Sequence, residues 1–392
     1  MNRIDIDYLN LLRDILDNGV EKDTRAGMVK SVFGRQLRFD LKSGIPLLTT
    51  KKVFTKGAIH ELLWFLNRPQ NSHGSMNIWY LIDNDVHIWD DDAFRWYKEW
   101  LNKHIKDRDK AWTHISYHVA VTDDEIGEKA RYEWWLFNEE KKKDDGWLFE
   151  IDKDEFITLA KERIEIVLTN EKSGSRERYR FGDLGPIYGK QWRNFGVSGT
   201  DQIEHIIETL KTNPNDRRMI CLAFNPDALE EMALPPCHVM MQFYTRELKR
   251  EERINEYKRR YGTEPAEIND DMILNINNIP KYGLSCMYTM RSNDIFLGCP
   301  FNLFSYGLLT YMIGKLVNMV PDELIGSLGD CHIYEAHFDA VEEQLNRKGS
   351  NTLPKLIIHG NQYSIEDFKY EDFEIIGYNP NPPIKAPLLV GV

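Results

Sequence analysis

The sequence predicts an α+β fold. Apolar residues recur at helical spacing in some segments and alternate at period two in others. The strand-like segments do not alternate regularly with helices, as the units of a parallel α/β sheet would. The chain has 392 residues, of which 42% are hydrophobic and 12% aromatic, so it can bury a large core.

The first elements follow one another closely. Residues 4–18 form an amphipathic helical pattern, whose apolar stripe consists of Ile4, Tyr8, Leu11, Leu12 and Ile15. Alternation in "KSVFGRQLRFDL" predicts a strand over 30–41, and "GIPLLTT" is the turn that follows it. The apolar segment "KGAIHELLWFL" predicts a helix over 56–66 that stops at "NRPQN".

The later elements complete the α+β pattern. Helices are predicted at 199–213 and 302–320, and strands at 218–224, 239–244, 284–291 and 355–359. Two charged segments interrupt this order. Residues from about 93 to 180 are rich in tryptophan, which predicts a folded insertion, because disordered segments are poor in aromatic residues. Residues from about 246 to 281 predict a second, charged and helical insertion.

Charge and composition narrow the function classes. The net charge of −12 gives no basic field that would favour DNA. The N-terminal residues lack the apolar core of a signal peptide, and no apolar run is long enough to span a membrane. The five cysteines have no disulfide-like spacing, which fits a reducing compartment. We therefore expect a cytoplasmic protein without a DNA or membrane partner.

Cys237, in "EMALPPCHVMMQFY", is the residue that most suggests chemistry. Free cysteines are most often small buried hydrophobes, and we expect that role for Cys221, Cys286 and Cys299. Metal binding is the second alternative, but adjacent Cys–His pairs on a strand point to opposite faces. No metal is therefore expected. The third alternative is a nucleophile, held rigidly by the two prolines that precede it.

A nucleophilic thiol must ionise, so it needs positive charge nearby. "NDRRMICLAF" supplies Arg217 and Arg218, and "MRSNDIF" supplies Arg291. Guanidinium groups bind phosphate through two hydrogen bonds at once. The residues alone therefore suggest a rigid thiol, several arginines and a phosphorylated substrate.

Several long motifs carry a family resemblance. The segments "GDLGPIYGKQWRNFG", "RRMICLAFNPDALEEMALPPCH", "MRSNDIFLGCPFN", "LGDCHIYEAH" and "IIGYNPNPPIKAP" resemble thymidylate synthases, in the order in which that family has them. "TTKKVFTKGAIHELLWFL" and "VHIWD" are similar to its N-terminal part. The resemblance implies a single domain over 1–392 with the two insertions, built on a large twisted mixed sheet covered by helices.

The resemblance also implies a reaction. A cysteine adds to C6 of deoxyuridylate (dUMP), and 5,10-methylenetetrahydrofolate supplies the one-carbon unit and a hydride, which gives thymidylate and dihydrofolate. The matching positions make Cys237 the nucleophile and Glu61 the general acid/base. The remaining catalytic positions by this resemblance are Tyr188, His238, Asp294 and Asn302.

The substrate positions follow from the same motifs. Those implied for dUMP are Arg25, Arg217, Arg218, Arg291, Ser292, Asn302, His332 and Tyr334. Those implied for folate are Lys51, Trp89, Asp294 and Gly298. In this family the adjacent arginine pair comes from the partner subunit, so a homodimer with shared active sites is implied. Two alternatives stay open: a hydroxymethylase that acts on dUMP or, less readily, dCMP, and a catalytically silent homologue that binds nucleotide or RNA.

Overall fold

The computed structural model describes residues 1–67, 75–104, 114–119, 151–170, 175–265 and 270–389. These residues divide into two compact units. The first comprises Met1–Leu66, Asp201–Phe224 and Cys237–Val392, and the second comprises Asn67–Thr200 and Asn225–Pro236. No helix among the described residues is both long and apolar enough to cross a lipid bilayer.

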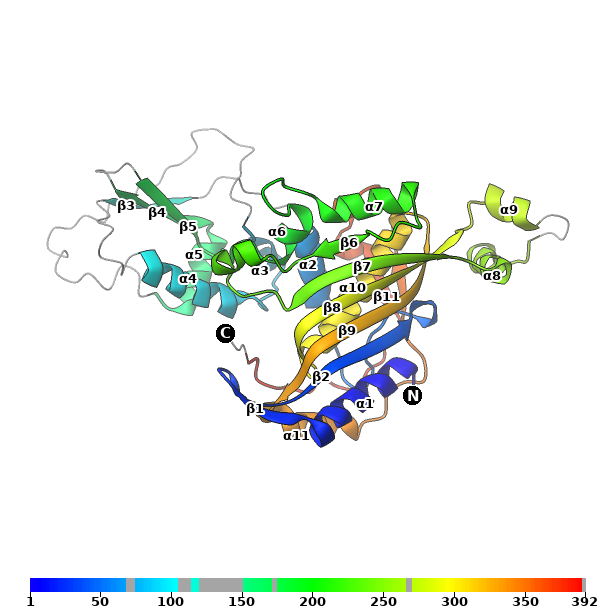
Figure 1. Ribbon diagram of the computed structural model, residues 1–392, viewed down its shortest axis with the longest axis horizontal. Coiled ribbons are helices and arrows are strands. Elements are labelled where there is room, and N and C mark those ends of the chain that lie inside the picture. The colour runs from blue at the N-terminus through cyan, green and yellow to red at the C-terminus, as the bar shows by residue number, and fades with distance from the viewer. Residues whose placement is uncertain (68–74, 105–113, 120–150, 171–174, 266–269, 390–392) are drawn as a thin grey trace. The chain divides into compact units, whose positions relative to one another are not determined.

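A six-stranded sheet in the order β1-β2-β9-β8-β7-β6 forms the centre of the first unit (Figure 1). Neighbouring strands are antiparallel except β8 and β9, which are parallel, so the sheet is mixed. Its strands are β1 (Val20–Thr24), β2 (Gly27–Asp40), β6 (Ile220–Leu222), β7 (His238–Glu247), β8 (Tyr282–Asp294) and β9 (Val320–Tyr334). Strands β10 (Lys355–Ile358) and β11 (Phe373–Ile376) form a separate antiparallel pair.

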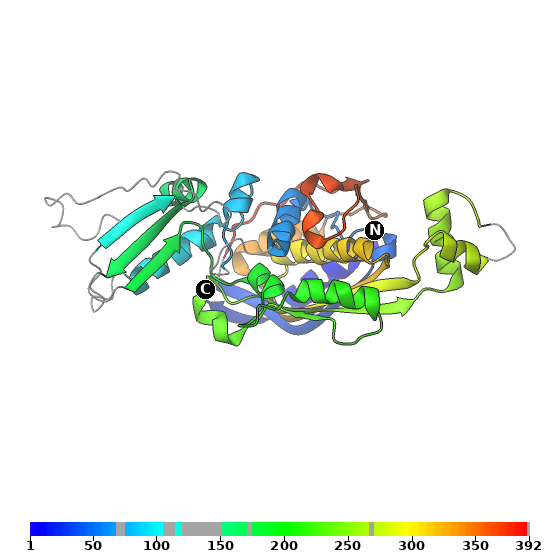
Figure 2. The same cartoon turned by 90° about the horizontal axis from the view of Figure 1, so that it is seen from above.

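Helices pack on the sheet in layers, which Figure 2 shows from above: the sheet, then α10, then α2. Helix α10 is apolar on nearly all sides, as a helix between two layers must be. Gly307 on α10 permits a close approach, because a Cβ there would lie 2.5 Å from Cγ of Pro46. The helices of this unit are α1 (Arg3–Asn18), α2 (Thr55–Leu66), α7 (Gln202–Thr212), α8 (Arg250–Tyr261), α9 (Asp270–Ile276), α10 (Gly298–Leu316) and α11 (Phe338–Leu345).

The apolar stripe predicted for α1 is buried in full, and the side chain of Asn2 caps the helix by accepting a hydrogen bond from the amide of Asp5 at 2.9 Å. The α+β class is confirmed, and each helix and strand predicted above has a counterpart within a few residues. Strand β9 was not predicted, although it lies between β2 and β8 in the sheet.

The first predicted insertion, about 93–180, lies entirely within the second unit. The described elements of this unit are α3 (Trp79–Asp83), α4 (Asp90–His104), α5 (Lys153–Lys161), α6 (Tyr188–Arg193) and the sheet β3-β4-β5, with strands His114–Val119, Ile164–Asn170 and Ser175–Arg180. Its aromatic core includes Tyr97, Phe156, Tyr179 and Phe181. The insertion is thus folded over its described part, and residues 105–113, 120–150 and 171–174 lie outside the described residues.

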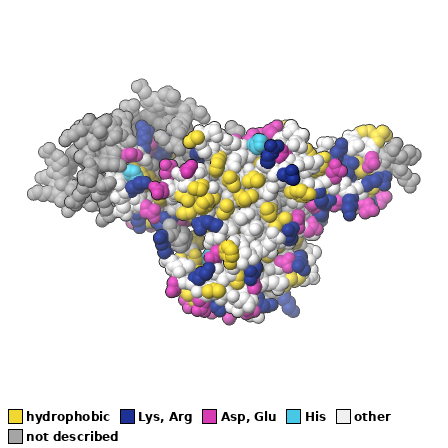
Figure 3. Space-filling model, in the orientation of Figure 1, with side chains coloured by type: hydrophobic (Ala, Val, Ile, Leu, Met, Phe, Trp, Pro, Cys, Tyr) yellow, Lys and Arg dark blue, Asp and Glu magenta, His cyan; other side chains and the backbone are white. Residues whose placement is uncertain are grey.

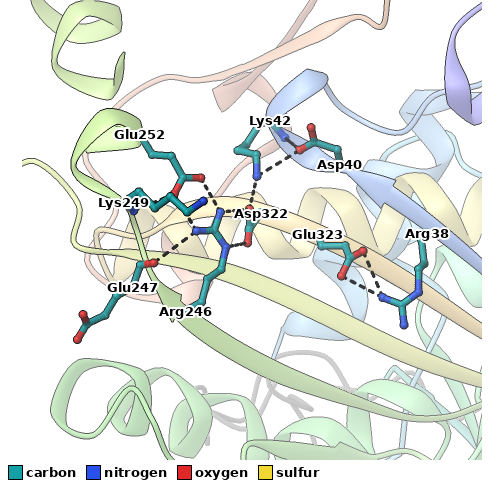
Figure 4. A network of polar contacts seen from close by, with 9 residues as sticks. All are labelled: Arg38, Asp40, Lys42, Arg246, Glu247, Lys249, Glu252, Asp322 and Glu323. Carbon is teal, nitrogen blue, oxygen red and sulfur yellow. Dashed lines mark hydrogen bonds and ion pairs between the residues drawn. The ribbon is translucent and has the colours of Figure 1, made fainter. Parts of the chain in front are cut away.

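The second predicted insertion contributes α8 and α9 to the first unit and is attached to the sheet by ion pairs (Figure 4). Arg246 of β7 donates to Asp322 of β9, with Nε–Oδ2 at 2.6 Å, and to Glu252 of α8, with Nη2–Oε1 at 2.6 Å. Lys42 also donates to Asp322, and Glu252 accepts from the amide of Lys249 at 2.8 Å. The beginning of α8 is therefore fixed to two central strands.

Replacing the carboxylate at the centre of this network should destabilise the protein. In Asp322→Asn, Arg246 and Lys42 lose a charged acceptor whose side chain is 9% exposed. We expect the free energy of unfolding, measured by urea denaturation, to fall by about 1–3 kcal/mol.

Its sequence neighbour provides the control. Glu323 pairs with Arg38 at 3.2 Å, but these side chains are 39% and 55% exposed, so Glu323→Gln should change the stability by no more than about 0.5 kcal/mol. Equal losses in the two variants would contradict a special role for the Arg246 network.

Candidate active site

Cys237 lies directly before β7, at the end of the sheet where β8 leads into α10. The amide of Arg291 donates to the carbonyl oxygen of Cys237 at 2.9 Å, which fixes the cysteine backbone against β8. Cys237 is partly exposed, whereas the other four cysteines, all of them described, are buried.

Burial also raises the pKa of buried thiols, which keeps them protonated. It raises the pKa of Cys286 and of Cys331 to about 12, and it also raises the pKa of Cys299. These three remain thiols at neutral pH, and Cys221 is 0% exposed. The prediction that Cys221, Cys286 and Cys299 are buried is confirmed. Within the described ranges, no group of three or more His, Cys, Asp or Glu side chains could hold a metal ion.

The residue after the cysteine forms a polar pair with α10. His238 Nε2 lies 3.1 Å from Nδ2 of Asn302, and His238 Nδ1 lies 2.9 Å from the hydroxyl of Tyr306. Burial lowers the pKa of His238 to about 4, so the ring is neutral at physiological pH. The amide nitrogen of Asn302 is a donor, so Nε2 accepts and the ring proton is on Nδ1. The amide oxygen of Asn302 does not take part in this pair.

The parallel pairing of β8 with β9 brings further predicted residues together. Asp294 lies opposite His332, and its Oδ1 accepts from the amides of Phe296 and Leu297 at 2.9 and 3.1 Å, just before α10. The rings of His332 and Tyr334 meet edge to face, with 5.2 Å between centroids. The pKa of the Tyr334 hydroxyl is raised first by burial and then by the charges of Asp294 and Cys237. Asp294 and Cys237 are therefore close enough to Tyr334 to affect the ionisation of its hydroxyl.

Asp330 is a supporting residue that the sequence analysis missed. Its Oδ1 accepts from the hydroxyl of Ser31 at 2.7 Å and lies 3.4 Å from Nδ1 of His332. The bond to His332 is the main reason why the pKa of Asp330 is lowered to about 2. Tyr306 was missed too, although it follows Asn302 by four residues and therefore shares its helix face. Asp330 could have been noticed two residues before His332 in "GDCHIYEAH".

The arginines predicted to bind phosphate are all exposed. Arg25 lies in the turn between β1 and β2, at one edge of the sheet, and Arg291 lies near the end of β8. Arg218 precedes β6 at the opposite edge and binds Asp216 through Nη2 at 2.7 Å and Nε at 3.1 Å.

The register of β6 and β7 separates the arginine pair from Cys237 in the same chain. Ile220 lies opposite Gln242, so Arg218 continues the ladder toward Tyr244, seven residues beyond Cys237. At about 3.3 Å per strand residue, this corresponds to roughly 20 Å.

Glu61 and Lys51 occupy contrasting positions in the first unit. Glu61 is partly exposed on α2, although its neighbours His60 and Leu62 are buried. Lys51 is only 6% exposed, donates to the carbonyl oxygen of Phe296, and lies 3.5 Å from the centroid of the Phe296 ring. Burial lowers the pKa of Lys51 to about 7. Its ammonium group is therefore oriented toward the segment that leads into α10.

Two of the predicted aromatic residues lie together in the second unit. The rings of Trp89 and Tyr188 meet edge to face, with 5.8 Å between centroids, and their side chains are 8% and 3% exposed. The two rings therefore pack against each other within this unit.

A partly exposed thiol beside an arginine, with a neutral histidine and an amide next to it, is typical of an enzyme that uses covalent catalysis. The family model described as thymidylate synthase matches residues 6–390. A thymidylate synthase of Francisella tularensis subsp. holarctica is 36% identical over 398 residues, which cover 98% of this chain and 99% of that protein. Thymidylate synthases of Listeria monocytogenes and Coxiella burnetii are each 35% identical with the same coverage.

The chain thus belongs to the thymidylate synthase family, which makes it an enzyme of the methyltransferase class. The resemblance stated from its motifs is confirmed. The family implies dUMP as the substrate and a folate as the co-substrate.

The buried lysine predicts a pH dependence of stability. In the folded state Lys51 loses its proton near pH 7, whereas in the unfolded chain it keeps it to about 10.4. The unfolded state then binds more protons between these values, so the free energy of unfolding should rise with pH in this window. In Lys51→Met this rise should be smaller, as measured by urea denaturation from pH 7 to 10.

Lys52→Met is the matched control, because Lys52 is the exposed neighbour. This variant should keep the slope of the unmodified protein. The same slope in Lys51→Met and in the unmodified protein would show that Lys51 does not titrate in this range.

Proposed function

We propose that this chain converts dUMP into thymidylate with 5,10-methylenetetrahydrofolate, through a covalent bond between Cys237 and C6 of the pyrimidine. The observation that carries the assignment of the nucleophile is the position of Cys237, partly exposed and hydrogen-bonded to the backbone of Arg291. The folate supplies the one-carbon unit and the hydride and leaves as dihydrofolate.

Cys237 acts in the first and the last step of the proposed reaction. Its thiolate adds to C6, and the electron pair of the C5–C6 double bond moves toward C5, which becomes the nucleophile for the one-carbon unit. After C5 has lost its proton and received the methyl group, the C6–S bond breaks and the thiolate leaves. A soft thiolate suits both steps because it is a good nucleophile and a good leaving group. Glu61, partly exposed between buried neighbours on α2, is the proposed general acid/base for the O4 side.

Asn302 is the residue proposed to recognise the uracil base. One N–H of its amide is donated to the neutral ring of His238, so the other N–H can be donated to O4 of uracil while Oδ1 accepts from N3–H. His238 therefore holds the amide in the orientation that suits uracil, and Tyr306 holds His238. His332 and Tyr334 are proposed to bind the sugar hydroxyl. The hydroxymethylase and the silent homologue are not favoured by the family comparisons.

The phosphate site is proposed to combine two subunits. Arg25, Arg291 and Ser292 would come from the chain that holds the nucleotide. Arg217 and Arg218 lie roughly 20 Å along the sheet from their own Cys237, which is too far for one phosphate. In a homodimer, each chain can contribute this arginine pair to the phosphate site of its partner, so the distance within one chain is no obstacle.

The exposed face of the sheet supports the dimer. On β7, Phe243 and Thr245 are buried, whereas Tyr244 between them is 65% exposed. Figure 3 shows hydrophobic side chains gathered over the middle of this face. Tyr244, Met287 and Ile325 line a hollow of about 520 Å³ there. A second copy is the occupant that we propose, because a two-fold axis would cover both faces with one set of contacts.

The hydrogen-bond acceptor that Asp294 offers just before α10 fits a folate ring. Asp294 uses Oδ1 for two backbone amides, and its Oδ2 has no partner among the described residues, so it can accept from ring and amino N–H groups. Lys51, Trp89, Asp294, Gly298 and Tyr188 are the residues proposed to hold the co-substrate. No metal is part of the proposal.

The remaining expectations belong to the same proposal. A reducing cytoplasm suits a chain whose five cysteines are all free. A single family domain over 1–392, with insertions at about 93–180 and 246–281, remains our prediction for the domain organisation.

Replacing the nucleophile tests the mechanism. Cys237→Ser should lose several orders of magnitude in kcat, because a serine hydroxyl does not ionise at neutral pH. Cys221→Ser removes a fully buried thiol and should keep most of the activity. The measurement is thymidylate and dihydrofolate formation, followed by mass spectrometry of the adduct with 5-fluoro-dUMP. An adduct on any cysteine other than Cys237 would refute the assignment.

Mixing two inactive chains tests the shared site. Cys237→Ser lacks the nucleophile, and Arg218→Glu lacks the arginine proposed to reach the partner's site. In a heterodimer, one site combines Cys237 of the second variant with Arg218 of the first, so activity should be recovered. Sedimentation should show a dimer. If verified subunit exchange restores no activity, the arginine pair acts within its own chain or not at all.

A further inference from the structure

A groove in the first unit lies between α8, the end of α10 and β10, and the function proposed above does not use it. Its volume is about 870 Å³, whereas sites that bind organic ligands typically measure about 300–1,000 Å³. The apolar side chains that line it include Leu41, Leu248 and Met319, which are buried, and Leu356, which is partly exposed. The groove therefore offers apolar surface to a bound molecule.

One wall of the groove is an edge of β10. All four residues of this strand, Lys355–Ile358, line the groove, although successive side chains of a strand point to opposite faces. The groove therefore borders the backbone of the strand. The amide of His359 donates to the carbonyl oxygen of Asp372 at 2.8 Å, which continues the antiparallel register of β10 and β11. By the alternation of such a ladder, the N–H and C=O groups of Leu356 and Ile358 point away from β11.

These outward backbone groups face the groove and are only partly satisfied. Nζ of Lys315, near the end of α10, donates to the carbonyl oxygen of Ile358 at 2.7 Å, so the outward edge faces α10. Within the described residues, the N–H and C=O of Leu356 and the N–H of Ile358 have no hydrogen-bond partner. Two donors and one acceptor along a strand edge match the backbone of an extended peptide, which can add to a sheet as a further strand.

The groove is also cationic, although the whole chain has a net charge of −12. At one end, Lys42 and Glu252 belong to the Arg246 network, in which two cations face two carboxylates (Figure 4). The other charged residues of the lining are one carboxylate, Glu256, and four cations, Arg259, Arg260, Lys315 and Lys355.

The single carboxylate is already occupied. Oε1 of Glu256 accepts from Nη2 of Arg259 at 2.6 Å and from Nε of Arg260 at 3.1 Å. Lys355 is exposed and has no acidic partner among the described residues. Positive charge therefore remains in the groove for a ligand with carboxylates.

We propose that this groove binds an acidic segment of another protein in an extended conformation, which adds to β10 as a third strand beside β11. The backbone of the segment pairs with Leu356 and Ile358, and its carboxylates face Lys355 and the two arginines of α8. An apolar side chain of the segment packs on the apolar lining. The inference does not depend on the reaction at Cys237.

The test measures the fluorescence anisotropy of a labelled peptide, Glu-Val-Glu-Val-Glu, with the full-length protein. We expect saturable binding with a Kd of roughly 100 μM or tighter. A peptide with lysine in place of each glutamate should bind at least about tenfold more weakly, because its charge is reversed. A peptide with every backbone amide nitrogen methylated keeps the carboxylates but cannot pair with a strand edge, and it should also lose about tenfold.

Variants of the protein locate the binding site. Lys355→Glu should raise the Kd of the acidic peptide by about fivefold or more. Lys211→Glu is the matched control, because Lys211 is an exposed lysine of α7 that does not line the groove, and its Kd should stay within about twofold. Leu356→Pro removes an outward N–H without removing a hydrogen bond to β11, and it should also raise the Kd by about fivefold. If Leu356→Pro does not fold, as thermal unfolding shows, the methylated peptide tests the same bond.

Two results would overturn the proposal. One is the absence of saturable binding of the acidic peptide up to about 1 mM. The other is equal binding of the acidic peptide and its methylated form, which would show that the groove attracts negative charge but does not pair with a strand.

Discussion

The site depends on the pairing of β8 with its two neighbours. Its antiparallel pairing with β7 fixes the backbone of Cys237 against Arg291, and its parallel pairing with β9 places Asp294 opposite His332. The chain then turns into α10, which carries Asn302 back to His238. One strand end thus positions the thiol, the residue proposed to recognise the base and the pair proposed to bind the sugar.

Most of the fold was predictable because its elements have strong local patterns. The stripe of α1 and the alternation of β2 each reflect burial on one face, which the sequence records directly. Strand β9 was not predictable in this way, because its Pro321 and Gly326 are poor strand formers. The structure explains Gly326: a Cβ there would lie 2.6 Å from the hydroxyl of Tyr288. Packing in three dimensions, rather than local preference, makes this segment a strand.

In the candidate site, too, some residues could be predicted from the sequence and others depend on three-dimensional contacts. Long motifs identified the residues that are proposed to carry the chemistry. They did not identify Asp330 and Tyr306, whose importance lies only in which side chain they contact. They also gave no physical reason for the proposal that Arg217 and Arg218 serve another chain. That reason comes from the register of β6 and β7, which a sequence does not contain.

The contrast between Cys237 and the four buried cysteines has a practical consequence. A reagent that attacks thiolates, such as a maleimide dye, would find one accessible target among five, so the protein carries a natural labelling position where the nucleotide is proposed to bind. Bound nucleotide would shield that position, and the labelling rate would then report occupancy without any engineered cysteine. By the same chemistry, mild oxidants that modify Sγ of Cys237, the proposed nucleophile, would inactivate the enzyme, and a thiol reductant would restore it while the modification was still a sulfenic acid.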